Sequence, residues 1–283
     1  MNLERISIQN QSNSKAISLI WRNSKFQSIE NSALYIHNRN IPWVICMPNT
    51  VGCAMKCKFC SIQYSNSPTL IEYKEIWKIY KKSLSILNPP REHQISFMGH
   101  GEPLLNLDNI IKFCNKLLSI NDQVVVGFST VGITDKLDIL MNQDFSKRIK
   151  LQISFHAWPS EKRKQIIPVE AKYPIEETIN IAMRYAIKYD KKYCINYVLF
   201  SDFNDSEDDV EKLCSIINQK YFYIKVSSFN SFNNSSLISA SSERTEKFIN
   251  LLKQKKYEVH SFTSLGVAIG VGCGQTSILA NLE

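Results

Sequence analysis

From residue 42 onward, short apolar runs alternate with segments whose apolar residues recur at helical spacing. Such runs predict buried strands, and apolar spacings of three and four predict amphipathic helices. The seven runs lie at residues 43–47, 94–98, 124–129, 151–155, 193–200, 223–229 and 259–262. The first six are spaced as repeated strand–helix units, which need parallel strands and right-handed crossovers. The pattern therefore predicts an α/β protein, either an incomplete barrel or an open doubly wound sheet.

Residues 1–41 show a different pattern. Two apolar stretches at 16–21 and 26–36, separated by polar residues, predict a small β-hairpin or short sheet beside the main fold. We therefore predict an N-terminal extension over residues 1–41 and a main domain over residues 42–283.

Capping residues predict where two of the helices begin. Thr69 and Glu72 fit a capping box ahead of apolar residues that share one helical face. Ser206 is followed by three acidic residues, which favour the positive end of a helix dipole. We expect helices to start at both places.

The chain of 283 residues carries a formal net charge of +8. A basic balance suits a polyanion such as RNA, because phosphate contacts release counterions, but a lysine-rich solvated surface gives the same balance. No signal segment and no apolar stretch approaching ~18 residues is visible, so we expect a cytoplasmic protein without a membrane span. Its eight cysteines are then expected to bind metal, act in catalysis or lie buried.

Three of these cysteines, Cys53, Cys57 and Cys60, fall in one short segment. Three thiolates in one loop can converge, and soft thiolates select iron–sulfur clusters or zinc. A four-iron cluster with three protein ligands keeps one iron open for the amino and carboxylate groups of a substrate. A structural zinc ion would need a fourth ligand, for which His37 and His93 are candidates without a fixed spacing. A third interpretation is that the three cysteines are incidental or simply buried.

This cysteine spacing, with Phe59 between the last two cysteines, resembles the radical S-adenosylmethionine (SAM) superfamily. Enzymes of that superfamily use a [4Fe-4S] cluster to cleave SAM to a 5′-deoxyadenosyl radical. Other motifs follow in order at predicted strand ends, namely GHGEPLLN at 99–106, STVG at 129–132, SFHA at 154–157, IPV at 167–169, Tyr173, Asn230 and CGQ at 273–275. Together, over roughly residues 26–276, they are similar to the RlmN/Cfr family of radical RNA adenine methylases. The resemblance implies an incomplete (β/α)6 TIM-type barrel with its site at the carboxyl ends of the strands.

The resemblance also implies roles for particular residues. The cofactors would be SAM and a [4Fe-4S] cluster on the three clustered cysteines. Cys273 would be methylated by one SAM, and a radical from a second SAM would remove a hydrogen from that methyl group. The methylene radical would add to an electrophilic ring carbon of adenine, Cys46 would help to resolve the adduct, and Glu30 matches a glutamate proposed as proton acceptor. The residues implied in SAM binding are Gly101, Glu102, Ser129, Ser154, Phe155, His156 and Asn230.

The sequence departs from the family pattern where substrate would be recognised. His100 replaces a methionine, Asn196 replaces a common glutamate, and the segment before Cys273 lacks the usual arginine and Gly-Asp pair. Family members usually begin with a helical accessory domain, so we expect this RNA-docking module to be missing or supplied by a partner chain. A group of basic residues is expected either to form an RNA-binding rim or to lie on an ordinary solvated surface. They are Lys147, Arg148, Lys150, Lys162, Arg163 and Lys164.

The resulting prediction is a radical SAM methyltransferase that methylates an sp2 carbon. The resemblance implies carbon 2 or carbon 8 of adenine in ribosomal or transfer RNA, with a flavodoxin or ferredoxin as electron donor. One alternative is a radical SAM enzyme that modifies a small molecule or peptide. Another is a non-enzymatic iron–sulfur or zinc protein that binds nucleic acid. The remaining cysteines, Cys114, Cys194 and Cys214, lie in apolar patterns and are predicted to be core residues.

Overall fold

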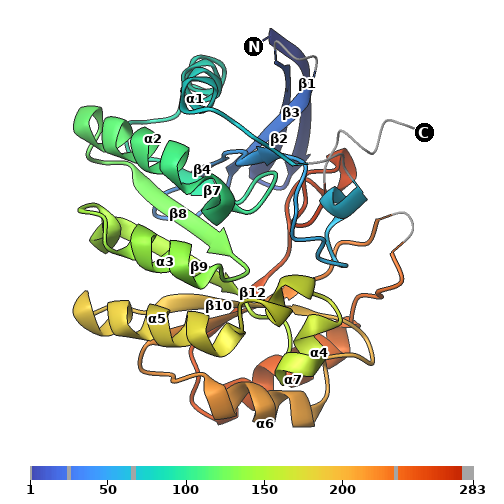
Figure 1. Ribbon diagram of the computed structural model, residues 1–283. Coiled ribbons are helices and arrows are strands. Elements are labelled where there is room, and N and C mark those ends of the chain that lie inside the picture. Colours follow the sequence, from blue (N-terminus) through green and yellow to red (C-terminus); the bar gives the residue numbers. More distant parts are fainter. Residues whose placement is uncertain (1, 24–26, 65–67, 233–234, 276–283) are drawn as a thin grey trace.

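The computed structural model describes residues 2–23, 27–64, 68–232 and 235–275. Its main feature is a ten-stranded sheet in the order β1-β2-β3-β4-β7-β8-β9-β10-β11-β12. Seven neighbouring strands are parallel and form the wall of a partial barrel (Figure 1). They are β4 (Trp43–Cys46), β7 (Gln94–Phe97), β8 (Val125–Thr130), β9 (Ile149–Ser154), β10 (Tyr193–Leu199), β11 (Phe222–Ser228) and β12 (Val259–Phe262). The predicted barrel is confirmed, and the last predicted run adds a seventh parallel strand.

Three antiparallel strands precede the barrel, namely β1 (Asn2–Gln11), β2 (Ser14–Arg22) and β3 (Ser28–Tyr35). Strand β3 also pairs antiparallel with β4, so these strands extend the barrel sheet. The predicted boundary between residues 41 and 42 falls in the connection from β3 to β4. Strand β1 was not predicted, and its Ile6 and Ile8 side chains are exposed rather than packed in the core.

Helices cover the outer face of the barrel. In Figure 1, α1, α2, α3 and α5 lie side by side along this face, and α6 and α7 continue the layer. No described helix combines the length and apolarity that a membrane crossing requires. The helices are α1 (Tyr73–Leu87), α2 (Leu107–Ile120), α3 (Thr134–Met141), α4 (Ser160–Lys164), α5 (Ile175–Lys188), α6 (Glu207–Ile216) and α7 (Ser242–Gln254).

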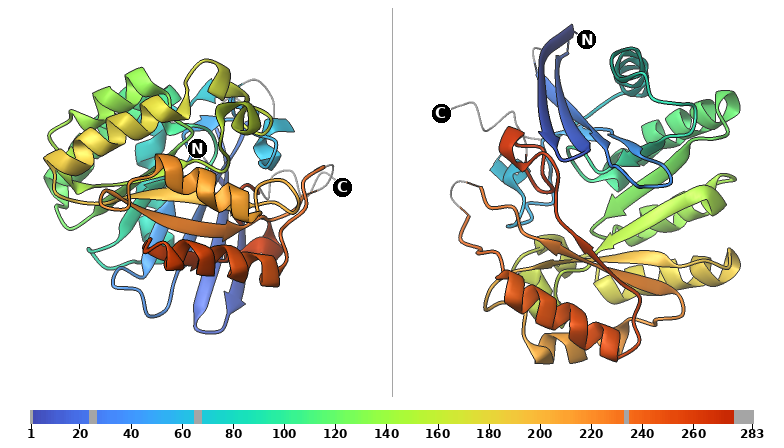
Figure 2. Two further views of the ribbon diagram at one scale, coloured as in Figure 1. Left: turned by 90° about the horizontal axis from the view of Figure 1, so that it is seen from below. Right: turned by 180° about the vertical axis from the view of Figure 1, so that it is seen from behind.

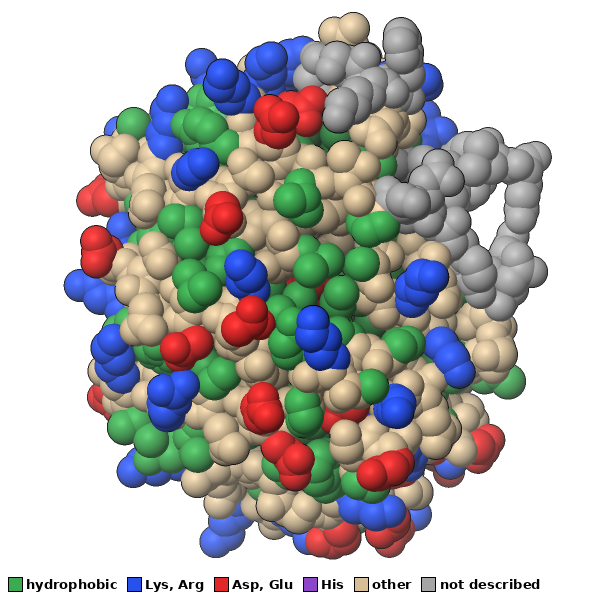
Figure 3. Space-filling model, viewed as in Figure 1, with side chains coloured by type: hydrophobic (Ala, Val, Ile, Leu, Met, Phe, Trp, Pro, Cys, Tyr) green, Lys and Arg blue, Asp and Glu red, His purple; other side chains and the backbone are tan. Residues whose placement is uncertain are grey.

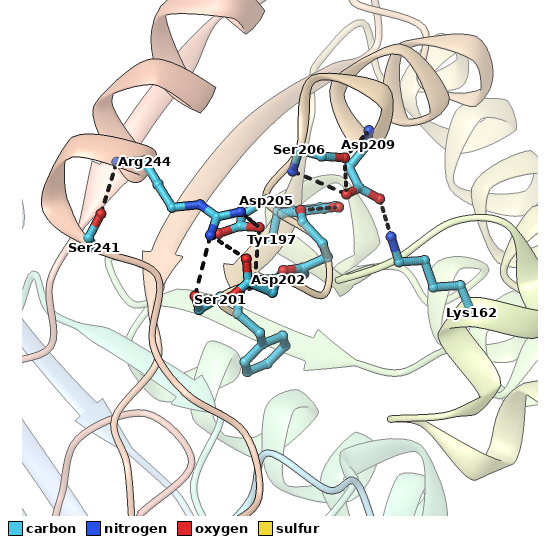
Figure 4. Close-up of polar contacts among 11 residues, drawn as sticks. Lys162, Tyr197, Ser201, Asp202, Asp205, Ser206, Asp209, Ser241 and Arg244 are labelled. Atoms are coloured by element: carbon cyan, nitrogen blue, oxygen red, sulfur yellow. Dashed lines mark hydrogen bonds and ion pairs between the residues drawn. The ribbon is translucent and has the colours of Figure 1, made fainter.

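One of the two predicted helix starts is confirmed. The Ser206 hydroxyl accepts a hydrogen bond from the Asp209 backbone nitrogen at 3.2 Å, and the Asp209 carboxylate accepts one from the Ser206 nitrogen, which completes a capping box for α6 (Figure 4). The other predicted box is wrong. Thr69 lies in the short strand β6 (Thr69–Leu70), paired with β5 (Thr50–Val51), and Glu72 caps α1 without a side-chain hydrogen bond.

The barrel strands alternate between an apolar outer face and a polar inner face. On β9, Ile149 and Ile153 are fully buried in the hydrophobic core, whereas Lys150, Gln152 and Ser154 line an internal cavity. Successive strand residues point to opposite faces, so this period of two places polar groups inside the barrel. TIM barrels usually fill their interior with branched apolar side chains. This barrel is instead hollow, and polar side chains stand among the apolar ones that line it.

The loop after β12 returns to the N-terminal strands. It contains the short 3-10 helix η5 (Val267–Ile269), and the Ala268 backbone nitrogen donates a hydrogen bond to Oε1 of Gln9 on β1 at 3.2 Å. Gly266 has a φ of +81°, and a Cβ atom there would lie 2.8 Å from the Ala16 Cβ on β2. Figure 2 shows this loop beside the N-terminal strands in the view from behind. The loop therefore packs on the opposite edge of the sheet from β12.

Candidate active site

The partial barrel encloses a cavity of about 960 Å³. Its wall is formed by the inward side chains of the parallel strands, together with the loops that follow β4 and β12. Every predicted site residue except Phe155 lines this cavity. Phe155 is fully buried in the core, where its ring stacks on Tyr197 with the ring centroids 6.3 Å apart.

The three clustered cysteines sit in the loop after β4, and their thiols are poorly suited to remain charged without a metal. Burial raises the pKa of Cys53 to about 11 and that of Cys60 to about 12, and it holds the pKa of Cys57 well above its ordinary value. The charge of Cys53 further raises the pKa of both Cys57 and Cys60, so the three thiols are close neighbours. A cationic centre is what such a set needs in order to ionise, so these residues fit an iron–sulfur cluster.

The two zinc-ligand candidates lie elsewhere. His93 is buried beside α1, where its Nδ1 atom lies 2.8 Å from the Pro90 carbonyl oxygen and its Nε2 atom 3.2 Å from the Tyr80 hydroxyl. His37 is exposed. Neither residue lines the cavity that the cysteines line. Among the described residues, no three His, Cys, Asp or Glu side chains converge on a single-ion site.

Glu102 is held by donors from its own chain. Its Oε1 atom accepts hydrogen bonds from the Thr130 hydroxyl at 2.7 Å and the Leu104 nitrogen at 3.2 Å, and Oε2 accepts one from the Val131 nitrogen at 3.0 Å. Burial raises the pKa of this carboxyl to about 7. Gly101, with a φ of +88°, allows the loop to approach Thr50, because a Cβ atom at residue 101 would lie 1.9 Å from the Thr50 hydroxyl. The loop thus presents a fixed carboxylate that can receive an ammonium group.

His156 is buried at the end of β9 in a left-handed conformation with a φ of +60°. Its Nδ1 atom accepts a hydrogen bond from the Val198 nitrogen at 3.0 Å, so Nε2 carries the proton of the neutral ring. Burial holds the pKa of His156 well below its usual range, and the nearby charges of Arg163 and Lys225 lower it further. The Phe59 ring packs edge-on against the His156 ring with the centroids 4.7 Å apart, which ties the cysteine loop to β9.

Cys273 lies at the surface of the loop after β12, and several hydrogen bonds fix its backbone. The Asn230 amide nitrogen donates to the Cys273 carbonyl at 3.0 Å and to the Ser264 hydroxyl at 2.9 Å, and that hydroxyl accepts from the Cys273 nitrogen at 3.2 Å. The Ser61 nitrogen donates to the carbonyl of Gly274 at 2.8 Å. Asn230, predicted to contact SAM, therefore fixes the loop after β12 internally, and the Ser61–Gly274 hydrogen bond joins this loop to the segment that follows the clustered cysteines.

Cys46 ends β4 on the same wall of the cavity. Burial is the main cause that raises its pKa to about 11, and the charge of Cys273 raises it further, so the two sulfurs are close enough to interact. Hydrogen bonding to Ser32 and the positive charges of Arg39 and Lys225 act in the opposite direction. The structure thus brings together two cysteines that are far apart in the sequence.

Glu30 projects into the cavity from β3. It accepts a hydrogen bond from the Ser18 hydroxyl at 2.6 Å, and its other oxygen lies 3.5 Å from Nε2 of His100. Both Glu30 and His100 are buried, so the histidine that replaces the family methionine faces the candidate proton acceptor. Ser129 and Ser154 also line the cavity, and the Ser129 hydroxyl accepts a hydrogen bond from Gln152 at 3.1 Å.

The predicted basic rim does not form a single surface. Arg163 is fully buried and ion-paired with Glu170, so the rim prediction is wrong for this residue. Lys162 pairs with Asp209, and Lys150 faces the cavity. The sequence-based prediction missed most of the polar groups in the amino-terminal and central parts of the barrel wall, although the alternation of the strand residues among them with apolar residues was a usable signal. These groups are Arg39, Gln94, Gln152, Tyr223, Lys225 and His260.

The other cysteines differ in their surroundings. Cys114 is fully buried in the hydrophobic core, as predicted. Cys214 is half-buried on α6, packed against that core. Cys194 is also a buried core residue, as predicted, and its side chain borders the cavity 3.8 Å from Oε1 of Gln152.

Comparison with known proteins supplies the family. The profile of the Radical SAM superfamily matches residues 47–214. A probable dual-specificity RNA methyltransferase RlmN from Pseudothermotoga lettingae is 32% identical over 82% of this chain and 68% of its own length. The protein of the same name from Dictyoglomus thermophilum is 30% identical over 89% of this chain and 73% of its own length.

Solved structures show the same fold. A radical SAM methyltransferase from Sphaerobacter thermophilus superposes with a TM-score of 0.85 at 23% identity, over 96% of this chain and 80% of its own. SuiB from Streptococcus suis, solved with S-adenosylmethionine, superposes with a TM-score of 0.52 at 17% identity, over 78% of this chain and 48% of its own. Both matches support the partial barrel as the common architecture.

Proposed function

Because this chain belongs to the RlmN/Cfr family of the radical SAM superfamily and is a radical SAM methyltransferase, we propose that it methylates adenine in RNA through a methyl group carried on Cys273. The observation that carries the proposal is the placement of Cys273 and Cys46 on one cavity with the three clustered cysteines. The proposed target is carbon 2 or carbon 8 of adenine in ribosomal or transfer RNA.

Different residues of the cavity wall would bind the cluster and SAM. Cys53, Cys57 and Cys60 would hold the [4Fe-4S] cluster, and the Glu102 carboxylate would receive the ammonium group of SAM. Bound together, cluster and SAM supply a transferable methyl group and a carbon radical. The neutral His156 ring can donate a hydrogen bond through Nε2 from the same wall.

Cys273 is suited to accept the methyl group because it is exposed at the cavity edge while its backbone is fixed. Its thiolate would attack the sulfonium methyl group, forming a new carbon–sulfur bond as S-adenosylhomocysteine leaves. The deoxyadenosyl radical from a second SAM would take a hydrogen atom from that methyl group and become 5′-deoxyadenosine, and the methylene carbon would bond to the adenine ring. The adduct would then lose one electron, for which the oxidised cluster is the available acceptor, and Glu30 would accept the ring proton. The thiolate of Cys46 would attack the Cys273 sulfur and break its bond to the methylene carbon, so that a disulfide forms and the methyl carbon takes up a proton as the base leaves.

Two partners belong to the proposal. A flavodoxin or ferredoxin would deliver the electron that the cluster needs, and a further chain would supply an RNA-docking surface. The chain spans about two thirds of the length of the relatives that it matches.

The proposal is tested by anaerobic turnover with methyl-labelled SAM and bulk ribosomal and transfer RNA. We expect Cys273→Ala to abolish label transfer, because the methyl carrier is gone. We expect Cys46→Ala to accumulate a covalent protein–RNA adduct, because the release step lacks its sulfur. Mass spectrometry of the nucleosides and of the protein reports the modified carbon and any methyl group on Cys273.

Cys214→Ala is the matched control, since this half-buried cysteine lies on α6 outside the cavity. It should transfer label at the wild-type rate. Undiminished transfer by Cys273→Ala would remove the proposed mechanism. Label on a peptide or small molecule, with none on RNA, would remove the proposed substrate.

A further inference from the structure

The amino-terminal end of the cavity carries an excess of positive charge. Arg39 comes from the loop before β4, Lys150 is the second residue of β9, and Lys225 lies in the middle of β11. All three side chains line the cavity. Among the described residues, the only carboxylates in the cavity wall are Glu30 and Glu102, and neither forms an ion pair with these cations.

The contacts of the three cations are with neutral groups, including the Phe262 ring, whose centroid lies 4.6 Å from Nζ of Lys225. Arg39 donates a hydrogen bond to Oε1 of Gln94 at 2.8 Å, and Lys225 donates one to Oε1 of Gln152. Both acceptors are neutral amides, which orient a cation without cancelling its charge. Within the described chain, none of the three forms an ion pair with Asp or Glu, while Glu258 at the nearby end of β12 pairs with Lys192 and His260.

Two of the cations, Arg39 and Lys225, lie near the sulfur of Cys46, and the third lies near Arg39. The positive charges of Arg39 and Lys225 both act on Cys46, and the charge of Arg39 also acts on Lys150. Strand register agrees, because Cys46, Ser96, Gly127 and Lys150 are successive partners across four strands. The Ser96 hydroxyl and the Gln94 amide nitrogen cover Gly127, at 2.9 and 3.0 Å from where its Cβ would lie, so this part of the wall is polar. All three cations line the same cavity, so an anion at its inner end would meet their combined charge.

We propose that Arg39, Lys150 and Lys225 form a phosphate-binding subsite for the nucleotide whose base is methylated. The inference rests on the proposed function and adds a substrate contact to it. A base that reacts at Cys273 must leave its stack and enter the barrel, and its own backbone phosphate then accompanies it. The cations at the inner end of the cavity offer the compensating charge that this phosphate needs.

The carboxylate of SAM is the competing occupant, and its position argues against it. That carboxylate would bind at the open iron, next to Cys53, Cys57 and Cys60 in the loop after β4. The cations belong instead to the loop before β4 and to the amino-terminal and central parts of β9 and β11. The cavity of about 960 Å³ lies near the upper end of the size range for ligand pockets, which suits two occupants at opposite ends.

The test measures binding of a fluorescein-labelled RNA hairpin with unpaired adenosines in its loop. Anisotropy titrations of the anaerobic holoenzyme are run over a range of KCl concentrations. Each lost phosphate contact should lower the slope of log affinity against log salt by about 0.7 to 0.9, which weakens binding about five- to tenfold near 0.1 M KCl. We expect this result for Lys150→Gln and for Lys225→Gln, while Lys150→Arg and Lys225→Arg should keep the wild-type slope.

Two controls sharpen the result. Lys112→Gln removes an exposed charge from α2, outside the cavity, and should change neither affinity nor slope. The second control is a hairpin in which a neutral methylphosphonate replaces the phosphate beside the reacting adenosine. With wild-type protein, this hairpin should show the same reduction in salt slope as the Lys225→Gln variant shows with the unmodified hairpin. Combining the modified hairpin with Lys225→Gln should reduce the slope no further. Iron content and the thermal unfolding midpoint report whether each variant is folded and loaded.

The outcomes separate the two proposals. If wild type binds and methylates RNA but both glutamine variants bind with unchanged affinity and slope, the subsite is wrong and the methylase proposal stands. If the glutamine variants lose SAM affinity instead of RNA affinity, the cations serve the cofactor and the subsite is again wrong. If wild type neither binds nor methylates RNA, both proposals fail.

Discussion

At the residue scale, Arg163 shows how burial changes the meaning of a charge. In the sequence it stands between Lys162 and Lys164 and resembles an exposed basic patch. In the structure it is fully buried, pairs with Glu170 and donates hydrogen bonds to the carbonyl oxygens of Phe155 and Val131. No local pattern distinguishes the two situations, because helix α4 is too short to show an apolar stripe.

Arg163 is therefore predicted to stabilise the fold rather than to bind RNA. Arg163→Met should lower the free energy of unfolding by about 3–5 kcal/mol, because it leaves Glu170 buried without its counterion. The double variant Arg163→Met with Glu170→Gln should recover part of this loss, since the glutamine oxygen can still accept from Ser160 and Ile175. Chemical denaturation measures both values. A single variant as stable as wild type would show that the pair is dispensable.

His93 predicts a pH dependence of stability. Burial lowers the pKa of His93 below its ordinary value. Below about pH 6.5 the unfolded chain takes up a proton that the folded chain does not, so the free energy of unfolding falls as the pH drops. His93→Gln cannot titrate and should lack this contribution, which amounts to as much as about 1.4 kcal/mol per pH unit in that window. Chemical denaturation at about pH 7.5 and about pH 5.5 gives the change in the free energy of unfolding for the wild type and for His93→Gln. Parallel pH dependences would contradict the assignment.

At the element scale, the sequence predicted helices and strands correctly where several local signals agreed, and incorrectly where only one was present. The Ser206 capping box was readable because serine and three acidic residues precede the apolar positions of α6. The Thr69–Glu72 pattern predicted a capping box that does not form, because Thr69 belongs to β6, which pairs with β5. That pairing is made by backbone groups, so the side chains of the two strands do not reveal it. Strand β1 was missed because its apolar residues are exposed and its order comes from pairing with β2. Helix α3 was missed because it is only 8 residues long.

The cap of α6 gives a prediction at this scale. Ser206→Ala should reduce the free energy of unfolding by about 0.5–2 kcal/mol, because the Asp209 nitrogen loses its acceptor. Ser215→Ala is the matched control, since Ser215 is an exposed residue of the same helix that bonds only back to the Lys212 carbonyl. This control should change stability by less than about 0.5 kcal/mol. Equal effects in the two variants would show that the cap contributes nothing.

At the scale of the whole molecule, the sequence predicted the barrel and most of the cavity wall. Strand ends carry the reactive groups, and parallel strands bring their carboxyl ends together, so Cys53, Glu102 and Cys273 could be assigned to one region in advance. The cationic end of the cavity was only partly predictable, because alternation with apolar residues marks Lys150 and Lys225 as inward-facing but gives no such signal for Arg39, which lies in a loop. On the face shown in Figure 3, basic and acidic side chains are interspersed, so the net charge of +8 is not gathered there.

The loop after β12 packs against β1, β2 and the cysteine loop. The candidate active site is therefore complete only when the last part of the described chain is in place. A ribosome would have made the three clustered cysteines and nearly all of the barrel before it reached Cys273. Under the proposed mechanism, a product cut short before that residue, by premature termination or by proteolysis, would keep the proposed iron ligands but lack the proposed methyl carrier. Such a fragment is expected to consume SAM while modifying nothing.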